Sequence, residues 1–203
     1  ELRGLRPDQV ARLGITRMFQ NIELFPHLSV LDNILVGRHL QVNYTALETV
    51  FMAGRMLREE LRHLRAAEEV IDFLDLQAVR HKPVASLPYG IQKKVELGRA
   101  LCMDGDLLLL DEPFGGLSLE EKQDMARYVL ENLRKSGTTV LLIDHDMQAV
   151  ADIADRITVL DHGVRIADGT PDEVFSDGRG QEAYLGTQAR DALDMDRAGE
   201  ADR

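Results

Sequence analysis

The sequence has few of the residues that several functions require. It contains no Trp, a single Cys, and only four Tyr and six Phe among 203 residues. Stacking of nucleic-acid bases on aromatic platforms is therefore excluded as a main function. The lone Cys102 excludes an internal disulfide and a zinc site built from cysteines, and it favours a reducing compartment.

Positive charge and long hydrophobic runs are also scarce. The chain has 24 Lys and Arg against 35 Asp and Glu, a net charge of −11. This balance argues against nucleic acid as a partner and against adsorption to anionic lipid through charge alone. The apolar runs are short, as in LLLL at 107–110, and none approaches the ~20 residues of a membrane span. No signal peptide is recognisable at the start.

What remains is the composition of a globular protein, with 44% hydrophobic and 29% charged residues. Such a length suits one large domain or two small ones. The segment 29–105 is rich in helical periodicity, including helices at 46–76 and 91–103, and Ser29 is suited to cap its first helix. From residue 106 strands and helices alternate, which predicts parallel strands with right-handed crossovers.

Two strands after this change end in polar residues. The strand at 107–111 leads into Asp111 and Glu112, and the strand at 138–143, which we also expect to be buried, leads into His145. Open α/β sheets bind their ligands at the carboxyl ends of strands. Two adjacent carboxylates repel each other unless a cation lies nearby, so we expect Asp111 to hold a hydrated magnesium ion and Glu112 to activate a water. Solvated acids at a strand end are the simpler alternative.

Two weaker signals precede the acids. The turn LPYGIQ, at 87–92, leads into a helix with Lys93 and Lys94 in its first turn, an unfavourable place that hints at an anionic neighbour. A helix start of this kind can bind phosphate, although an ordinary capped helix explains the turn equally well. Gln20 follows the short strand at 15–19 and means little by itself.

The order of these features resembles the nucleotide-binding subunit of ABC transporters, over residues 1 to about 186. Gln20 matches the Q-loop, LPYGIQ the signature motif, Asp111 the Walker B Asp, Glu112 the catalytic Glu, GGLS at 115–118 the D-loop, and His145 the switch histidine. ITRMFQN at 15–21, LDNILVGRH at 31–39, ADGTP at 167–171 and AYLG at 183–186 further resemble the branched-chain amino acid (LivG-type) subgroup.

The resemblance implies a fold and a set of roles. The fold is α/β, a P-loop NTPase-like ABC ATPase core with an α-helical subdomain. Its divisions are 1–28 with the Q-loop, 29–105 as the helical subdomain, 106–178 as the α/β core, and a partly disordered tail at 179–203. The implied catalytic residues are Glu112, His145 and Gln20. The implied magnesium ligands are Asp111 and Gln20. The residues implied to contact ATP bound in a paired subunit are Leu87, Pro88, Tyr89, Gly90, Gln92 and Ser118.

The sequence departs from the family pattern at several positions. No G-x-x-x-x-G-K-[ST], the loop that cradles phosphates, occurs in the 203 residues. We therefore expect an incomplete core, truncated before the Q-loop, that binds MgATP weakly or not at all by itself. Pro88, Tyr89 and Ile91 replace the consensus Ser, Gly and Gln of the signature, and Ser118 replaces the D-loop Asp. Pro88 and Tyr89 nevertheless fit the branched-chain subgroup.

The resemblance also implies partners and a location. These are a second ATP-binding subunit, membrane permease subunits and, indirectly, a periplasmic solute-binding protein, at the cytoplasmic face of a bacterial inner membrane. No nucleic acid is expected. The alternatives are a soluble ABC-type ATPase that serves translation or DNA repair, a regulatory cassette without a P-loop, and a generic α/β domain that carries the motifs by accident.

Overall fold

A computed structural model describes residues 2–41 and 53–176 of the chain, and these divide into two compact units, Glu1–Ile143 and Asp144–Arg203. The first seven residues of the helix expected at 46–76, and the tail at 179–203, lie outside the described residues. Each unit is considered by itself.

The first unit contains a three-stranded parallel sheet in the order β1-β2-β3. The strands are β1 (Ile15–Met18), β2 (Leu107–Asp111) and β3 (Thr139–Ile143). Met18 pairs with Leu110, and Leu110 with Leu142, so the carboxyl ends of all three strands meet at one edge. Strands that lie far apart in the sequence thereby bring Gln20, Asp111 and Glu112 to the same edge. The alternation after residue 106 predicts the parallel pairing of β2 with β3 but not the place of β1.

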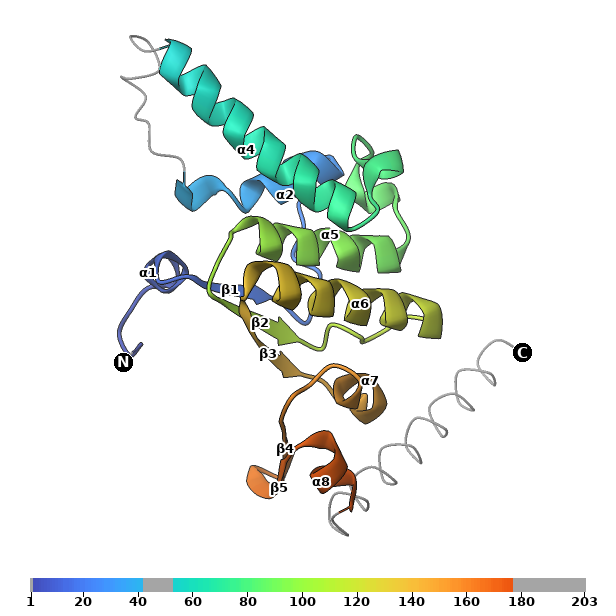
Figure 1. Ribbon diagram of the computed structural model, residues 1–203. Coiled ribbons are helices and arrows are strands. Elements are labelled where there is room, and N and C mark those ends of the chain that lie inside the picture. The colour runs from blue at the N-terminus through green and yellow to red at the C-terminus, as the bar shows by residue number, and fades with distance from the viewer. Residues whose placement is uncertain (1, 42–52, 177–203) are drawn as a thin grey trace, which may run out of the picture. The chain divides into compact units, whose positions relative to one another are not determined.

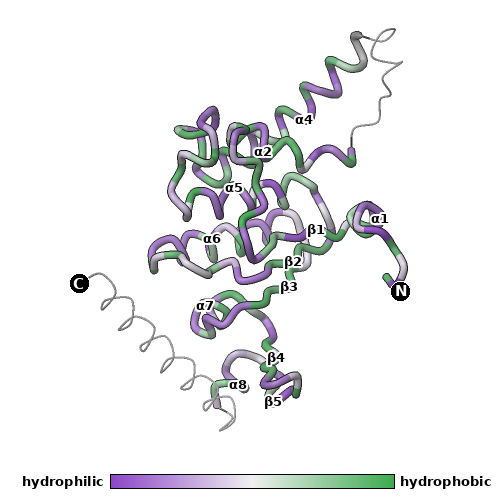
Figure 2. The backbone as a smooth tube through the Cα atoms, turned by 180° about the vertical axis from the view of Figure 1, so that it is seen from behind, coloured by the Kyte–Doolittle hydropathy of each residue, from purple (hydrophilic) through white to green (hydrophobic). Residues whose placement is uncertain are grey.

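The helices α5 (Tyr89–Cys102) and α6 (Leu119–Ser136) run side by side across one face of this sheet (Figure 1). Under them lie the even-numbered strand residues, of which Met18, Leu108 and Leu110 are at most 1% exposed. The opposite face carries Leu141 and Ile143, which are 56% and 61% exposed. The expectation that β3 is buried on both faces is therefore wrong, although its residues are hydrophobic along the strand (Figure 2).

The helical block packs on α5. It consists of α2 (Val30–Val36), α4 (Ala53–Phe73) and the short 3-10 turns His39–Gln41, Gln77–Val79 and Val84–Ser86. Ile34 of α2 and Leu74, just after α4, are fully buried and pack against Gly98 of α5. A Cβ on Gly98 would lie within 3.1 Å of both side chains. The apolar stripe expected on α4 is covered only in its second half, because Leu57 and Leu61 are 56% and 41% exposed.

Local sequence signals explain where several helices begin and end. The Ser29 hydroxyl accepts a hydrogen bond from the amide of Asp32 and caps α2, as predicted. Gly137 closes α6 with a left-handed φ of 69°. The helix α5 begins at Tyr89, two residues earlier than predicted, so Lys93 and Lys94 lie in its second turn. A further short helix, α1 (Pro7–Arg12), precedes β1.

The second unit contains α7 (Met147–Ala151) and the antiparallel hairpin of β4 (Ile157–Asp161) and β5 (Val164–Gly169). It ends at α8 (Pro171–Ser176). The amide of Thr170 donates to the Glu173 carboxylate at 2.9 Å, and the Thr170 hydroxyl accepts from the Glu173 amide at 3.4 Å. These two bonds form a capping box. Ile157, Ala167 and Val174 form its small core.

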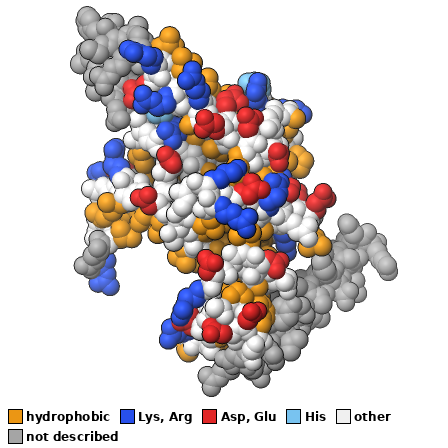
Figure 3. Space-filling view, in the orientation of Figure 1, with side chains coloured by type: hydrophobic (Ala, Val, Ile, Leu, Met, Phe, Trp, Pro, Cys, Tyr) orange, Lys and Arg blue, Asp and Glu red, His pale blue; other side chains and the backbone are white. Residues whose placement is uncertain are grey.

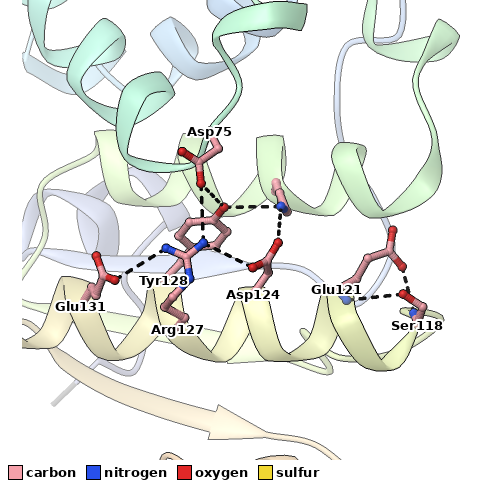
Figure 4. Close-up of polar contacts among 8 residues, drawn as sticks. Asp75, Ser118, Glu121, Asp124, Arg127, Tyr128 and Glu131 are labelled. Carbon is pink, nitrogen blue, oxygen red and sulfur yellow. Dashed lines mark hydrogen bonds and ion pairs between the residues drawn. The ribbon is translucent and has the colours of Figure 1, made fainter.

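Positive and negative side chains are intermingled on the face of the molecule that shows α4, α5 and α6 (Figure 3). Several polar side chains connect α6 with α5 and with Asp75 of the helical block (Figure 4). Lys94 of α5 donates to Asp124 of α6 at 3.0 Å, and the buried Tyr128 hydroxyl donates to Asp75 at 2.9 Å. Burial works to lower the pKa of Lys94, but its hydrogen bonds to Asp124 and Tyr128 outweigh burial and raise it. An anionic neighbour was expected near Lys93 and Lys94, and for Lys94 this neighbour is Asp124.

Candidate functional site

Gln20 and Glu112 meet at the carboxyl edge of the sheet. The Gln20 side-chain nitrogen donates to the Glu112 carboxylate at 2.9 Å, although the two residues are 92 positions apart. Gln20 lies two residues after β1, and Glu112 directly follows β2. The parallel pairing of these two strands therefore brings together two of the residues that the sequence marks as catalytic.

The Glu112 backbone is held in an unusual conformation. Its φ of 48° lies in the left-handed region, which costs energy for a residue with a side chain. Its amide donates to the Ile143 carbonyl of β3 at 2.7 Å, and its carbonyl accepts from the Lys93 ammonium at 3.4 Å. These contacts fix the chain where it leaves β2, so the Glu112 carboxylate is aimed from a rigid element.

Asp111 has a cationic partner that the sequence reasoning did not identify. Arg17 of β1 donates to the Asp111 carboxylate at 2.7 Å, and its guanidinium lies 4.8 Å from the Phe19 ring centroid. Both side chains are at odd-numbered positions of neighbouring strands and so lie on the same face of the sheet. This shared parity is the signal in the sequence that predicts their meeting.

The oxygen donors at this edge fit a magnesium ion. Carboxylate and amide oxygens are its preferred protein ligands, commonly one or two per site with water and phosphate completing the shell. Asp111 and Gln20 supply such oxygens, and the Asp111 carboxylate is engaged by the Arg17 guanidinium. Within 2–41 and 53–176, no three His, Cys, Asp or Glu side chains gather closely enough to hold a metal by themselves.

The signature turn packs against the D-loop segment of the same chain. Pro88 precedes α5 and Tyr89 begins it, with the Tyr89 ring against Gly116, where a Cβ would lie 3.0 Å from a ring carbon. Gly90 is buried against the Glu121 carboxylate, which would have to move to admit a side chain there. The Tyr89 side chain is partly exposed at 45%.

Three other predicted site residues make local contacts. The Gln92 side chain donates to the Leu87 carbonyl at 2.8 Å, and Leu87 is buried. The Ser118 amide donates to the Glu121 carboxylate at 2.8 Å, and the Ser118 hydroxyl accepts from the Glu121 amide. These bonds form the capping box of α6. The roles of Leu87, Gln92 and Ser118 in binding a nucleotide stay predictions.

His145 belongs to the second unit. Its imidazole is 59% exposed and lies 3.7 Å from the Asp144 carboxylate. It follows β3 by two residues, as the sequence predicts. Its approach to Glu112 stays a prediction.

Sequence reasoning also missed the burial of three charged side chains on α5. Lys93 and Glu96 are each 1% exposed, and Arg99 is mostly buried. Lys93 donates to the Gln20 carbonyl at 3.0 Å. The sequence indicates that Lys93 and Lys94 lie unfavourably close to the start of a helix. The pattern of α5 alone does not reveal what these side chains contact.

This sheet, the paired Gln20 and Glu112, and the helical block define an ATP-binding cassette. The sequence model described as ABC transporter matches residues 4–115, and the chain belongs to that family. It is 33% identical over 186 residues to the high-affinity branched-chain amino acid transport ATP-binding protein BraF of Pseudomonas aeruginosa, with coverage of 92% of this chain and 73% of the relative. It is 32% identical to LivG of Escherichia coli K12, with coverage of 91% and 72%.

Solved structures agree with this assignment. The crystal structure of the ADP conformation of MJ1267, an ATP-binding cassette of an ABC transporter, matches with a TM-score of 0.71 and 28% identity. The match covers 90% of this chain and 72% of that one. A nucleotide-free ATP-binding cassette from an ABC transporter matches with a TM-score of 0.69, 27% identity and coverage of 89% and 72%. The predicted family, LivG-type resemblance and α/β cassette fold are confirmed.

Proposed function

We propose that this chain is the ATP-binding and ATP-hydrolysing subunit of an ABC importer for branched-chain or other amino acids. The observation that carries the proposal is the 2.9 Å hydrogen bond between Gln20 and Glu112 beside Asp111. It joins two residues of the ATPase motifs at the edge where α/β sheets bind ligands. The similarity to LivG and BraF supports the substrate class.

Each residue at the edge has a distinct role in this proposal. Asp111 and Gln20 hold hydrated magnesium, whose charge offsets that of the ATP phosphates. Glu112 orients and deprotonates the attacking water, a contribution of roughly 10²–10⁴ in rate. Gln20 keeps the Glu112 carboxylate in position by donating to it, and His145 contacts a phosphate oxygen.

The paired site belongs to the proposal as well. Two cassettes associate head to tail, and each presents its signature residues to the nucleotide of the other. The contributing residues are Leu87, Pro88, Tyr89, Gly90, Gln92 and Ser118. The burial of Gly90 against Glu121 and the position of Tyr89 over Gly116 keep this turn rigid.

The location and partners follow from the same proposal. Two cassettes bind permease subunits at the cytoplasmic face of a bacterial inner membrane, and a periplasmic solute-binding protein delivers the solute to that permease. The family match and the names of the relatives support this arrangement. Among the described helices, none has the length and apolar character to cross a bilayer.

The phosphate-binding loop is the part of the machinery that this sequence does not contain. We therefore expect the 203-residue chain by itself to bind MgATP weakly and not to hydrolyse it. Isothermal titration calorimetry checks this expectation, and micromolar affinity would contradict it. Hydrolysis would need the loop from additional polypeptide, and a cassette that works without one would be regulatory instead.

The role of Glu112 is tested in the assembled, ATP-hydrolysing transporter. Glu112→Gln keeps the shape of the side chain but removes the base, so turnover should be abolished and an ATP-bound dimer should accumulate. Glu60→Gln on the exposed surface of α4 is the matched control and should hydrolyse normally. Undiminished hydrolysis by the Glu112 variant would refute its catalytic assignment.

A further inference from the structure

Three charged side chains on successive turns of α5 face one loop. The loop is the segment 20–23, which begins with Gln20. Lys93 donates from its ammonium to the Gln20 carbonyl at 3.0 Å and to the Glu112 carbonyl at 3.4 Å. One buried cation thus binds the backbone of both residues of the Gln20–Glu112 pair.

Glu96 and Arg99 bind the other end of the loop. The Glu23 amide donates to one Glu96 carboxylate oxygen at 3.4 Å, and the Arg99 guanidinium donates to the Glu23 carbonyl. Arg99 also lies 3.8 Å from that same Glu96 oxygen. Both polar groups of the Glu23 backbone are therefore engaged from α5.

The burial of these charges needs an explanation. Glu96 is 1% exposed, and its second carboxylate oxygen has no hydrogen-bond partner within the described part of the chain. Burial raises the pKa of Glu96, against the opposing effect of its contact with Glu23 and of the Lys93 and Arg99 charges. A buried ion pair usually contributes little to stability compared with apolar side chains of the same size, so stability alone is a weak reason for this cluster.

We propose that Lys93, Glu96 and Arg99 are positioning residues that clamp the segment 20–23 to α5 and so hold the Gln20 amide against Glu112. The inference rests on the proposed function for its catalytic meaning, since Gln20 and Glu112 are the residues being placed. The clamp itself is a property of this chain and is measurable without nucleotide.

Hydrogen–deuterium exchange on the 203-residue chain tests the clamp. Glu96→Leu and Arg99→Met remove the bonds to Glu23, and amides at 20–25 should exchange at least tenfold faster while those of β2 change far less. Glu96→Gln keeps an acceptor and Arg99→Lys keeps a donor, so both should exchange like the wild type. Each apolar variant is compared with the conservative variant at the same position. If one apolar variant does not fold, the comparison at the other position still tests the clamp.

Lys94→Met is the matched control on the same helix. Lys94 binds Asp124 and Tyr128 of α6 and not the loop. This variant should lower the melting temperature without selectively raising exchange at 20–25. Unchanged exchange at the loop in Glu96→Leu and Arg99→Met, or an equal increase throughout the protein, would overturn the clamp.

Hydrolysis in the assembled transporter separates the clamp from the proposed function. Glu96→Leu should lower kcat about tenfold with little change in KM for ATP, and Glu96→Gln should restore it. If loop exchange rises but kcat does not fall, the positioning role is wrong. If the wild-type assembly hydrolyses no ATP, the proposed function fails whatever the loop exchange shows. Normal hydrolysis by Glu112→Gln would refute the catalytic role of Glu112 alone.

Discussion

Gly90 occupies a place in the first turn of α5 where a side chain would fit only if the Glu121 carboxylate moved. A Cβ there would lie 1.9 Å from a Glu121 carboxylate oxygen and 2.5 Å from its carboxyl carbon. That carboxylate also accepts the Ser118 amide in the capping box of α6. The signature glycine therefore permits the start of one helix to pack on the cap of the next.

Gly90→Ala should destabilise the protein by about 1–2 kcal/mol, because the displaced Glu121 side chain loses its capping bond. Denaturant unfolding of both single variants and the double variant measures the coupling. In the Glu121→Ala background, Gly90→Ala should slightly raise the free energy of unfolding, since Ala has a higher helix propensity than Gly. Equal losses in the two backgrounds would show that Gly90 and Glu121 are independent.

Parity along neighbouring strands explains which residue contacts the sequence could predict. The strand pattern predicts Asp111 and Glu112 at a sheet edge, the family resemblance adds Gln20, and Gln20 does form a hydrogen bond with Glu112. The Arg17–Asp111 pair obeys the same rule but was overlooked. The contacts of Glu96 and Arg99 could not be predicted in this way, because they join a helix to an irregular loop more than 70 positions away.

At the scale of elements, α6 is fastened to the helical block through the Tyr128 hydroxyl. This hydroxyl donates to Asp75 (Figure 4) and accepts from Lys94 at 3.4 Å. The ring packs edge-on against Phe73. Burial, followed by the hydrogen bond to Asp75, raises the pKa of Tyr128. The contact depends on Asp75, which adopts a left-handed φ of 58° directly after α4 and Leu74.

Tyr128→Phe should lower the free energy of unfolding by about 1–2 kcal/mol, because the hydrogen bonds of the buried hydroxyl to Asp75 and Lys94 are lost. The aromatic contact with Phe73 is retained in this variant, so the loss reports the polar contacts. Tyr89→Phe makes the same chemical change at a partly exposed ring and should alter stability by less than about 0.5 kcal/mol. Urea unfolding of both variants provides the comparison, and similar losses would contradict the role of the network.

The elements themselves follow from short signals in the sequence. Ser29, Gly137 and the box at Thr170 lie where their chemistry predicts, because each cap acts within a few residues of its helix. Burial is harder to predict, since it depends on what covers an element. The hydrophobic run of β3 predicts burial on both faces, yet Leu141 and Ile143 remain mostly exposed.

At the scale of the molecule, the exposed sheet face decides how the chain behaves alone. Leu141 and Ile143 alternate with Val140 and Leu142, which are partly buried on the side of α5 and α6. Contiguous exposed apolar side chains favour association with other surfaces. The isolated chain should therefore associate weakly through this face, in a manner that depends on its concentration.

The double variant Leu141→Thr, Ile143→Thr keeps the strand preference of β3 and reduces its apolar surface. Its free energy of unfolding should stay within about 0.5 kcal/mol of the wild type, because the two side chains are already exposed. Sedimentation should show less association at equal concentration. Leu108→Ala, on the covered face, is the control and should cost about 2–5 kcal/mol. A comparable loss in the threonine variant would mean that this face is packed in solution, and β3 would then be a core strand as its sequence predicts.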